Sequence, residues 1–410
     1  MATKKEEGLK ISLTAEQKSM LESAIEKKKP IEFVETGNIG LDLALTDGKG
    51  LPLGASVLFW AKPGSGKTTI AADTGKRLIK QFKAKGEVFK VLYLAVESSD
   101  GLMTSLGLDE YMESKDFIYI TKPLCWRHIE TFYEAVLSNF KEYAGVKLII
   151  IDSVNNVLSD QNVKNSVADG DYGTKNKERA SFYSKYLPLC KERNISSFFI
   201  SQVRQRQNAG MFEDPNRAAV SSPDLHNVDI ILKCSSYNNS TDASKIEEET
   251  AFGLDKSASK LIFKMDSKAT DCKNRYFKGN AVELLFEKGK KVWNYYTVRK
   301  LLEGQKLVKS SAGWYWFDPE LCSSFNLPDS KMRLGTINNI VQEHVADFVN
   351  LLKKMGKYKV CISEKEVPAT IEELPESTQE TVEENTESIS ETDSEVPQQA
   401  KTTKKSTKKK

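Results

Sequence analysis

One eight-residue segment has the residue types and spacing of a phosphate-binding loop. The segment AKPGSGKT, from Ala61 to Thr68, follows the apolar run VLFW and precedes a stretch with helical periodicity. It fits the phosphate-loop pattern, with Ala61 where glycine is usual. Glycines let backbone amides curl around phosphate groups, and the amino terminus of the following helix adds partial positive charge. The sequence therefore predicts that a nucleotide is held by Ala61, Lys62, Pro63, Gly64, Ser65, Gly66, Lys67, Thr68 and Thr69.

Two of these side chains and one distant carboxylate indicate chemistry on a nucleoside triphosphate. Lys67 is placed to reach the β and γ phosphates, and the Thr68 hydroxyl is placed to hold Mg²⁺. The run LIIIDS, from Leu148 to Ser153, has the pattern of a buried strand and ends in Asp152. A carboxylate at such a strand end orients Mg²⁺ through water. ATP and Mg²⁺ are therefore the expected cofactors.

Two further strand ends supply groups that hydrolysis needs. The apolar part of VLYLAVESSD ends at Glu97, where a carboxylate can orient the attacking water, and Asp100 is the rival base. The run SSFFISQVR delivers Gln202, whose neutral amide can contact the γ-phosphate and report the state of the nucleotide. Simpler interpretations stay open: Glu97 as a solvated acid at a strand end, and Gln202 as a polar strand cap.

The elements that must position these residues alternate between short apolar runs and helical patterns. Helical patterns cover Thr68–Lys83, Trp126–Tyr143 and Ala180–Arg193. Short apolar strands separated by helices predict an α/β fold with a mostly parallel sheet that is buried on both faces. The predicted strands are Ser56–Trp60, Lys90–Val96, Phe117–Ile120, Lys147–Ile151, Ser196–Ser201, Asp229–Cys234, Leu261–Met265 and Ala281–Phe286.

The texture of the sequence changes at three places, which predicts four parts. Residues 13–28 have the spacing of a short amphipathic helix, which Pro30 ends. Residues 293–356 contain two helical stretches that flank an aromatic hairpin-like piece, Ser311–Phe317. Beyond Cys361 the chain is rich in Glu, Ser, Thr and Pro and cannot bury enough apolar surface to offset its ordering entropy. The predicted parts are an oligomerisation helix in 1–33, an ATPase core in 34–290, a small domain in 291–361 and a disordered tail in 362–410.

Composition narrows the class of protein. A hydrophobic content of 39% and an aromatic content of 9% suffice for a core. The sequence lacks a long apolar run of the length that a membrane span needs, and its start, MATKKEEGLK, does not resemble a secretory signal. Six cysteines lie far apart without paired metal-ligand spacing, which indicates reduced structural thiols. The expected location is the cytoplasm.

Charge is unevenly distributed along the chain. Residues 363–410 contain 12 acidic and 7 basic side chains, whereas residues 1–362 contain 53 basic and 45 acidic side chains. A basic body suits a polyanionic partner, although an excess of this size does not by itself establish nucleic-acid binding. We hypothesise that the acidic tail competes with a polyanionic partner for the basic body; the alternative is an inert, solubilising tail.

Deleting residues 363–410 is accordingly expected to raise the affinity of the protein for duplex DNA at low salt. Removing the negative charges removes an intramolecular competitor for the basic body. The measurement is a titration of labelled duplex with the full-length and shortened chains. Equal affinities at low salt would leave only the solubilising role.

Taken in order, these segments resemble the RecA family of recombinases, and in particular the phage-encoded recombinases of the UvsX kind. The stretch VETGNIGLDLALTDGKGLPLG (Val34–Gly54) is similar to the family's lead-in to the phosphate-loop strand. QVRQRQNAGMFEDP (Gln202–Pro215) is similar to its switch glutamine and the DNA-binding loop that follows. KLVKSSAGWYWF (Lys306–Phe317) resembles the core of the bacterial proteins' carboxy-terminal domain.

The resemblance implies an ATPase core of the RecA type that forms ATP-switched helical filaments of identical subunits on single-stranded DNA. It further implies pairing and strand exchange with a homologous duplex in recombination and repair, with single-strand-binding and loading proteins as partners. The host is a bacterium if the chain is phage-encoded. The family's catalytic glutamate falls on Glu97, its switch glutamine on Gln202, its phosphate lysine on Lys67, and its metal residues on Thr68 and Asp152.

The resemblance also implies residues that contact DNA and the neighbouring subunit. Asn155–Lys177 takes the place of the first DNA-facing loop and Val203–Val220 that of the second. The adenine contact falls near Asp100 or Met103. A basic pair that reaches the ATP of the next subunit falls on Lys264 and Lys268. Arginines suit phosphates and apolar side chains suit wedging between bases, so the implied DNA contacts are Arg204, Arg206, Met211, Phe212 and Arg217.

The sequence departs from the family after the second loop. The stretch AAVSSPDLHNVDI lacks the family's glycine pair and contains Pro223, with His226 near a polar position of the helix expected there. Two other functions stay open on the same core. One is a ring helicase or translocase, and the other is a non-catalytic mediator that holds ATP.

Overall fold

The computed structural model describes residues 14–16, 18, 30–97, 100–121, 125–160, 163, 174–205, 216–218, 222–237, 260–269, 271–287 and 291–359. All of them belong to the first of two units, which comprise residues 1–363 and 364–410. Most of the predicted amino-terminal helix and the whole predicted tail therefore lie outside the described residues.

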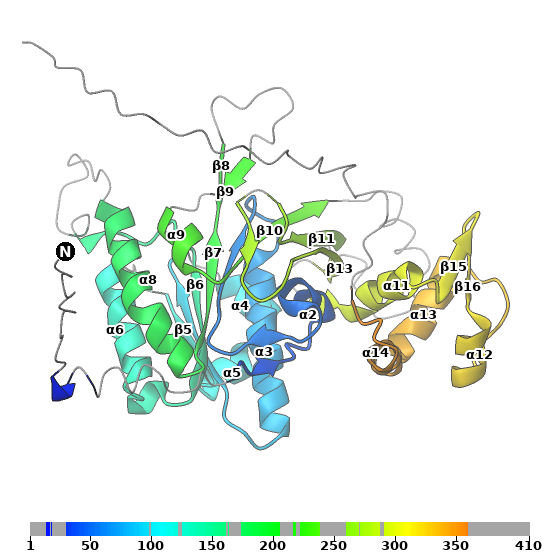
Figure 1. The fold of residues 1–410 in the computed structure, drawn as a ribbon, viewed down its shortest axis with the longest axis horizontal. Coiled ribbons are helices and arrows are strands. Elements are labelled where there is room, and N and C mark those ends of the chain that lie inside the picture. Colours follow the sequence, from blue (N-terminus) through cyan, green and yellow to red (C-terminus); the bar gives the residue numbers. More distant parts are fainter. Residues whose placement is uncertain are drawn as a thin grey trace, which may run out of the picture. The chain divides into compact units, whose positions relative to one another are not determined.

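A ten-stranded sheet dominates the described part of the chain, and six neighbouring strands in it are parallel (Figure 1). Neighbouring strands can run in the same direction because a helix or loop returns the chain to the starting edge of the sheet between them. Their order across the sheet is β10 (Ile230–Tyr237), β3 (Ser56–Trp60), β7 (Ser196–Ser201), β6 (Val146–Asp152), β4 (Lys90–Ala95) and β5 (Phe117–Ile120).

Antiparallel strands extend the sheet beyond β10. β11 (Lys260–Asp266) pairs with β10, β13 (Ala281–Glu287) pairs with β11, and β14 (Lys291–Trp293) pairs with β13. The two-residue strand β12 (Lys273–Asn274) also pairs with β10. The expectation of a mostly parallel α/β sheet is confirmed.

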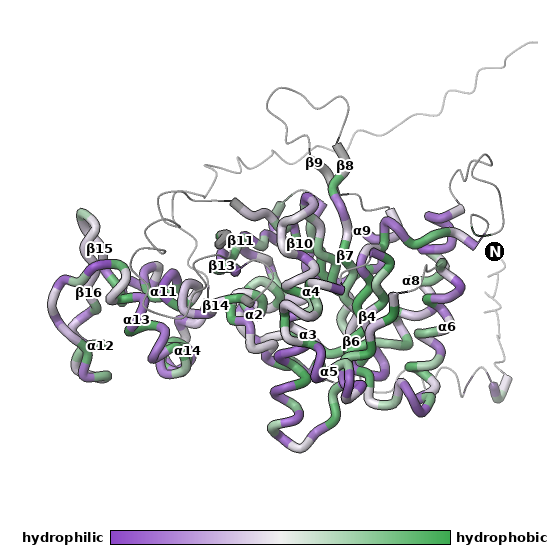
Figure 2. Tube along the Cα trace, turned by 180° about the vertical axis from the view of Figure 1, so that it is seen from behind, coloured by the Kyte–Doolittle hydropathy of each residue, from purple (hydrophilic) through white to green (hydrophobic). Residues whose placement is uncertain are grey.

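The central strands are buried on both faces because their side chains alternate between two hydrophobic clusters. Phe59 of β3 belongs to the cluster that contains α3 (Lys67–Ala84). The next residue, Trp60, belongs to the cluster that contains α6 (Trp126–Leu137) and α8 (Thr174–Glu192). Figure 2 shows hydrophobic residues along β4, β6 and β7, between these helices. The sheet therefore serves as a rigid platform whose strand ends hold the predicted site.

Short elements connect the larger ones. The side chain of Asn38 caps the first helix after the amino-terminal segment by accepting a hydrogen bond from Leu41 N at 3.2 Å. The short elements are β1 (Phe33–Val34), α2 (Ile39–Thr46), β2 (Leu51–Pro52), α4 (Asp100–Ser105), α5 (Asp109–Glu113), η1 (Lys141–Tyr143), β8 (Val203–Gln205), β9 (Asn216–Ala218) and α9 (Ser222–Asn227).

The predicted helix Trp126–Tyr143 is wrong at its carboxyl end. α6 ends at Leu137, and Asn139 adopts a left-handed conformation with φ of 55°. The chain then forms the separate 3₁₀ turn η1. Asparagine tolerates positive φ better than most residues, which explains why the helix ends there although apolar residues continue beyond it.

The carboxy-terminal part contains the predicted aromatic hairpin, but its helices differ from the prediction. α11 (Asn294–Gly304) precedes the hairpin strands β15 (Val308–Ser311) and β16 (Trp314–Phe317). Three helices follow the hairpin instead of one stretch: α12 (Pro319–Phe325), α13 (Leu334–Glu343) and α14 (Val345–Lys354). Residues of α11, α13 and α14 share one hydrophobic cluster with α3 and β13. The division into domains stays a prediction.

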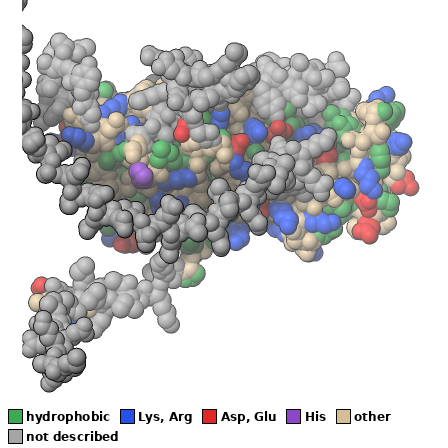
Figure 3. Space-filling model, turned by 45° about the horizontal axis from the view of Figure 1, so that its top comes forward, with side chains coloured by type: hydrophobic (Ala, Val, Ile, Leu, Met, Phe, Trp, Pro, Cys, Tyr) green, Lys and Arg blue, Asp and Glu red, His purple; other side chains and the backbone are tan. Residues whose placement is uncertain are grey.

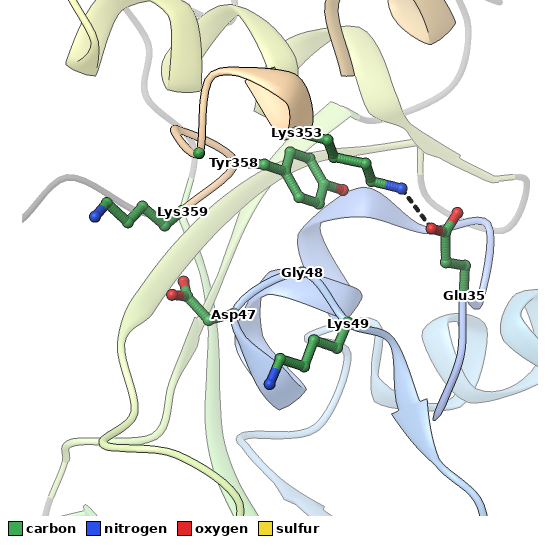
Figure 4. A pocket seen from close by; sticks show the side chains of 8 residues that line it. Glu35, Asp47, Gly48, Lys49, Lys353, Tyr358 and Lys359 are labelled. Carbon is green, nitrogen blue, oxygen red and sulfur yellow. Dashed lines mark hydrogen bonds and ion pairs between the residues drawn. The ribbon is translucent and has the colours of Figure 1, made fainter. Parts of the chain in front are cut away.

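The chain after α14 is fixed against the turn that follows α2. Figure 4 shows a pocket of about 470 Å³ between these segments. There the ring of Tyr358 lies where a Cβ atom on Gly48 would be 2.5 Å from it, so this turn requires glycine. Lys353 Nζ donates a hydrogen bond to Glu35 Oε1 across the same pocket. The last described residues are therefore anchored to the part of the chain that leads into β3.

Candidate nucleotide-binding and hydrolysis site

The predicted site residues come together at the carboxyl ends of four neighbouring parallel strands. Asp152 of β6 pairs with Ala95 of β4 and with Ile200 of β7, so these strands end at one level of the sheet. Trp60 of β3 pairs with Ser201 of β7 at the same edge. Ligands of open α/β sheets bind at this edge. The phosphate-loop segment, Glu97, Asp152 and Gln202 all follow directly from these strand ends.

The phosphate-loop segment has the backbone that its glycines require. Gly66 has φ of 94° and lies immediately before α3, where a Cβ atom would be 2.9 Å from the ring of Phe286. A Cβ atom on Gly64 would meet no atom within 4 Å, so the space beside this residue is open. A loop with positive φ at the start of a long helix and open space beside it fits the phosphates of ATP.

Lys67 is turned inward, onto the loop itself. Its Nζ donates hydrogen bonds to the carbonyl oxygens of Ala61 and Lys62, both at 3.0 Å, and the residue is 7% exposed. Burial lowers the pKa of Lys67, while Cys234 and the carboxylates of Asp152 and Glu97 act in the opposite direction. A phosphate would replace two neutral acceptors by charged ones and would favour the protonated lysine.

The two predicted metal residues are in direct contact. Thr68 Oγ1 donates to Asp152 Oδ2 at 2.6 Å, and the hydroxyl of Tyr93 donates to the same oxygen at 2.7 Å. Burial raises the pKa of Asp152, which the hydrogen bonds from Thr68 and Tyr93 oppose. Hard oxygen donors at one point fit Mg²⁺, which takes few protein ligands and completes its shell with phosphates and water. The described residues contain no group of three or more His, Cys, Asp or Glu side chains arranged for a metal ion.

Glu97 receives hydrogen bonds from three side chains. Its Oε1 atom accepts from Ser153 Oγ at 2.7 Å, from Asn156 Nδ2 at 2.6 Å and from Gln202 Nε2 at 2.7 Å. The predicted water-orienting glutamate and the predicted γ-phosphate contact are thus directly hydrogen-bonded. The sequence placed both residues at this edge but did not predict this contact.

Three residues near these strand ends were missed by sequence reasoning. Ser153 and Asn156 hydrogen-bond Glu97, and Asn155 Oδ1 accepts hydrogen bonds from Ser201 Oγ and from Gln202 N, both at 2.9 Å. The only signal was the polar run that follows the apolar strand LIIID.

The second predicted DNA-facing loop starts as a hairpin. β8 follows Gln202 directly and pairs with β9, with residues 204 and 217 opposite each other. Arg204 and Arg217 therefore lie on paired backbone positions, while Arg206, Met211 and Phe212 lie outside the described residues. Their predicted contacts with DNA stay predictions. In α9, which follows this loop, His226 is exposed and Asp224 is buried.

The first predicted DNA-facing loop is described only at its ends. Lys175, near the start of α8, donates from Nζ to the carbonyl oxygen of Asn155. Asp160 N donates to the carboxylate of Glu178 at 3.2 Å, and Asp160 forms an ion pair with Arg127 at 2.9 Å. The first end of this segment is therefore held by α8, and its last residues belong to that helix.

The remaining predicted contacts occupy two other places. Asp100 is exposed at the start of α4, whereas Met103 of the same helix is wholly buried in the core, so Asp100 is the better placed of the two for adenine. Lys264 Nζ lies 4.0 Å from Asp266 Oδ2, and the backbone N–H of Lys268 donates to Asp266 Oδ1. The role of both lysines toward a neighbouring subunit stays a prediction.

Positive charge does not concentrate in one place on the face shown in Figure 3. Among the described side chains there, Lys and Arg are dispersed between apolar and uncharged groups. A pocket of about 300 Å³ does place Lys62 of the phosphate loop near Lys233 of β10, together with Ser65 and Val203. Local charge at this edge, more than the overall balance, suits an anionic ligand.

Comparison with known proteins decides the family. The family model described as the RecA N-terminal domain matches residues 9–223, just over half of the 410 residues. The chain belongs to the RecA family. RecA-family membership agrees with the α/β sheet and with the phosphate loop at its carboxyl edge.

Individual RecA proteins are distant relatives. Protein RecA from Rhodopirellula baltica is 25% identical over 216 residues, which is 52% of this chain and 54% of that protein. Protein RecA from Nitratiruptor sp. is 26% identical over 221 residues, 52% of this chain and 60% of that protein. Protein RecA from Sulfurimonas denitrificans is 25% identical over 177 residues, 43% of this chain and 47% of that protein. The matches thus span about half the length of these relatives.

The helices of the structure can also be compared with the length and hydropathy that a membrane span needs. Among the described residues, no helix combines the length and the apolar character that crossing a membrane requires.

Proposed function

We propose that this protein is a DNA-dependent ATPase that assembles into ATP-switched filaments on single-stranded DNA. In these filaments it promotes pairing and strand exchange with a homologous duplex, in recombination and repair. Membership in the RecA family and the assembled phosphate loop support this proposal. The resemblance to phage-encoded recombinases makes a phage origin part of the proposal.

The observation that carries the proposal is the hydrogen bond between Glu97 and Gln202. This bond is 2.7 Å long. It joins Glu97, the predicted water-orienting group, to Gln202, the residue that immediately precedes the β8–β9 hairpin. Gln202 cannot turn its amide toward a γ-phosphate without changing its contact with Glu97, and its backbone continues directly into β8. Nucleotide state and the second DNA-facing loop are thereby mechanically connected, as an order–disorder switch requires.

Each residue at the sheet edge has a defined part in this proposal. Lys67 leaves the carbonyl oxygens of its own loop and contacts the phosphates, while Thr68 and Asp152 hold the metal side of the nucleotide. Mg²⁺, when bound, offsets the negative charge of the phosphates. Glu97 orients the attacking water and accepts its proton. Lys264 and Lys268 of one subunit reach the nucleotide of the next, so the site is complete only between subunits.

The test is the rate of ATP hydrolysis with and without single-stranded DNA, for the wild-type protein and for Glu97→Gln. We expect strong stimulation by DNA in the wild type and a loss of about 100-fold in the stimulated rate of the variant, since a glutamine cannot accept the proton. Asp100→Asn changes the rival carboxylate. Because Asp100 is also the candidate adenine contact, we expect this variant to raise the KM for ATP while its stimulated rate at saturating ATP stays near that of the wild type.

Other outcomes point to the other functions. Hydrolysis that is indifferent to DNA would remove the switch mechanism and favour a mediator that holds ATP. Closed hexamers in electron micrographs, with unwinding of duplex DNA, would favour a ring helicase. A loss in Asp100→Asn that equals the loss in Glu97→Gln would transfer the base role to Asp100.

A further inference from the structure

Two adjacent asparagines connect the residues on which the proposed hydrolysis depends. Asn156 donates from Nδ2 to Glu97 Oε1 at 2.6 Å. Asn155 accepts at Oδ1 from the backbone N–H of Gln202 and from the hydroxyl of Ser201, both at 2.9 Å. Asn156 thus contacts the segment that follows β4, and Asn155 contacts the end of β7 and the residue after it; β4 and β7 are the strands that flank β6. The two asparagines are the first residues of the predicted first DNA-facing loop, Asn155–Lys177.

The Oε1 atom of Glu97 accepts at least as many hydrogen bonds as its lone pairs can support. A carboxylate oxygen offers two lone pairs, yet Oε1 accepts from Ser153, Asn156 and Gln202. An oxygen that already accepts three hydrogen bonds is a poor proton acceptor, and the same contacts fix the orientation of the whole carboxylate, including Oε2. The same Gln202 amide nitrogen is the donor that contact with a γ-phosphate would use. In this arrangement both groups are therefore engaged with each other and with the loop stems.

We propose that Asn155 and Asn156 are positioning residues that restrain hydrolysis in the absence of DNA. Asn156 holds Glu97 in the saturated arrangement, and Asn155 fixes the backbone of Gln202 beside it. This inference rests on the proposed function and deepens it, because it names the regulation of the same site. Loss of these contacts frees Glu97 for water and Gln202 for the phosphate.

The opposite end of the loop reinforces this coupling. Lys175 Nζ donates to the carbonyl oxygen of Asn155, so the start of α8 is attached to the start of the loop. Because Asn155 also contacts Gln202 N, the first loop acts on the stem of the second without a separate signal.

The test is steady-state ATP hydrolysis by the full-length protein, with and without single-stranded DNA, for Asn156→Ala. The side chain of Asn156 is exposed, so the variant is expected to fold normally. We expect its DNA-free kcat to rise about tenfold, as the loss of one charge-assisted hydrogen bond to the base allows. The KM for ATP and the rate at saturating DNA stay near wild-type values, so stimulation by DNA shrinks by the same factor.

Paired variants of Asn155 separate positioning from general damage. Asn155→Leu has a similar shape without the acceptor oxygen, and we expect it to raise the DNA-free rate as Asn156→Ala does. Asn155→Asp keeps the acceptor and is expected to keep wild-type stimulation. Asn350→Ala, an exposed asparagine on α14, is the control and leaves both rates unchanged.

The outcomes distinguish this inference from the proposed function. If the wild type shows no stimulation by DNA, the proposed function fails, and this inference fails with it. If the wild type is stimulated and Asn156→Ala keeps the wild-type DNA-free rate, only the restraint is overturned. If Asn155→Asp behaves like Asn155→Leu, the role of the Asn155 acceptor is overturned.

Discussion

Replacing Asp224 by alanine is expected to lower the free energy of unfolding by about 3–5 kcal/mol. Asp224 Oδ2 and Arg179 Nη1 are 2.8 Å apart, and the two side chains are 0% and 2% exposed. Removing the carboxylate leaves the guanidinium buried without its charge partner, which is the reason for the large effect. The measurement is equilibrium urea unfolding followed by tryptophan fluorescence. Trp126 is a suitable reporter, because its ring centroid lies 5.1 Å from that of Phe182 on α8.

Two further variants define what this result means. Arg179→Met combined with Asp224→Leu replaces both charges by apolar groups and is expected to recover most of the lost stability. Lys185→Ala, also on α8, breaks an exposed ion pair with Glu134 of α6 and is expected to change stability little. A loss below about 1 kcal/mol in Asp224→Ala would contradict a buried, unscreened pair.

The Arg179–Asp224 pair has a functional consequence as well. Arg179 lies on α8, which follows the first predicted DNA-facing loop, and Asp224 lies on α9, which follows the second. The helices behind both loops are therefore joined in the protein interior. We expect Asp224→Ala to weaken binding of single-stranded DNA even at temperatures where the protein stays folded.

The second large effect concerns pH and Asp42. Burial raises the pKa of Asp42 to about 7, and Glu35 acts in the same direction, while hydrogen bonds from Thr36 and the charge of Lys353 oppose it. Tyr358 faces the same region, beside Glu35 and Lys353 (Figure 4). A folded protein that holds this proton more tightly than the unfolded chain is most stable, as far as Asp42 is concerned, below pH 4. This contribution is lost as pH rises toward 7.

Asp42→Asn is therefore expected to remove part of the pH dependence of stability. About three pH units at ~1.4 kcal/mol per unit give a contribution of ~4 kcal/mol, which disappears from the wild type between pH 4 and pH 7 and is absent from the variant. Asparagine keeps an oxygen for the hydrogen bonds that Thr36 donates to Asp42 Oδ1 at 2.9 and 2.7 Å. The measurement is the free energy of unfolding of both proteins across this range.

The control for this experiment is Glu110→Gln, which changes an exposed carboxyl on α5. Its pH profile is expected to follow that of the wild type. Parallel profiles for Asp42→Asn and the wild type would show that Asp42 titrates in the same range whether the chain is folded or unfolded.

Strands were easier to predict from the sequence than helix ends. The bounds of β3, β5 and β7 agree with the prediction. β3 and β7 are buried along their whole length, and all three strands contain a short apolar run with polar residues around it. α6 was predicted too long because Phe140 and Tyr143 continue the apolar pattern. The helix ends earlier because Asn139 adopts a left-handed conformation. β14 was missed because three residues are too few for a pattern.

The candidate site was predictable as a set of strand ends but not as a set of contacts. Parallel pairing places Glu97, Asp152 and Gln202 at one edge, and a sequence reveals that each follows an apolar run. Which atoms meet depends on the register of strands that are about fifty residues apart in the chain. Asn155 and Asn156 looked like ordinary loop residues for this reason, although they hydrogen-bond Gln202 and Glu97.

The pairing of β8 with β9 makes the stem of the second loop a lever. Residues 203 and 218 are opposite each other and move as one ladder, so a displacement that begins at Gln202 enters the intervening segment from both of its ends at once.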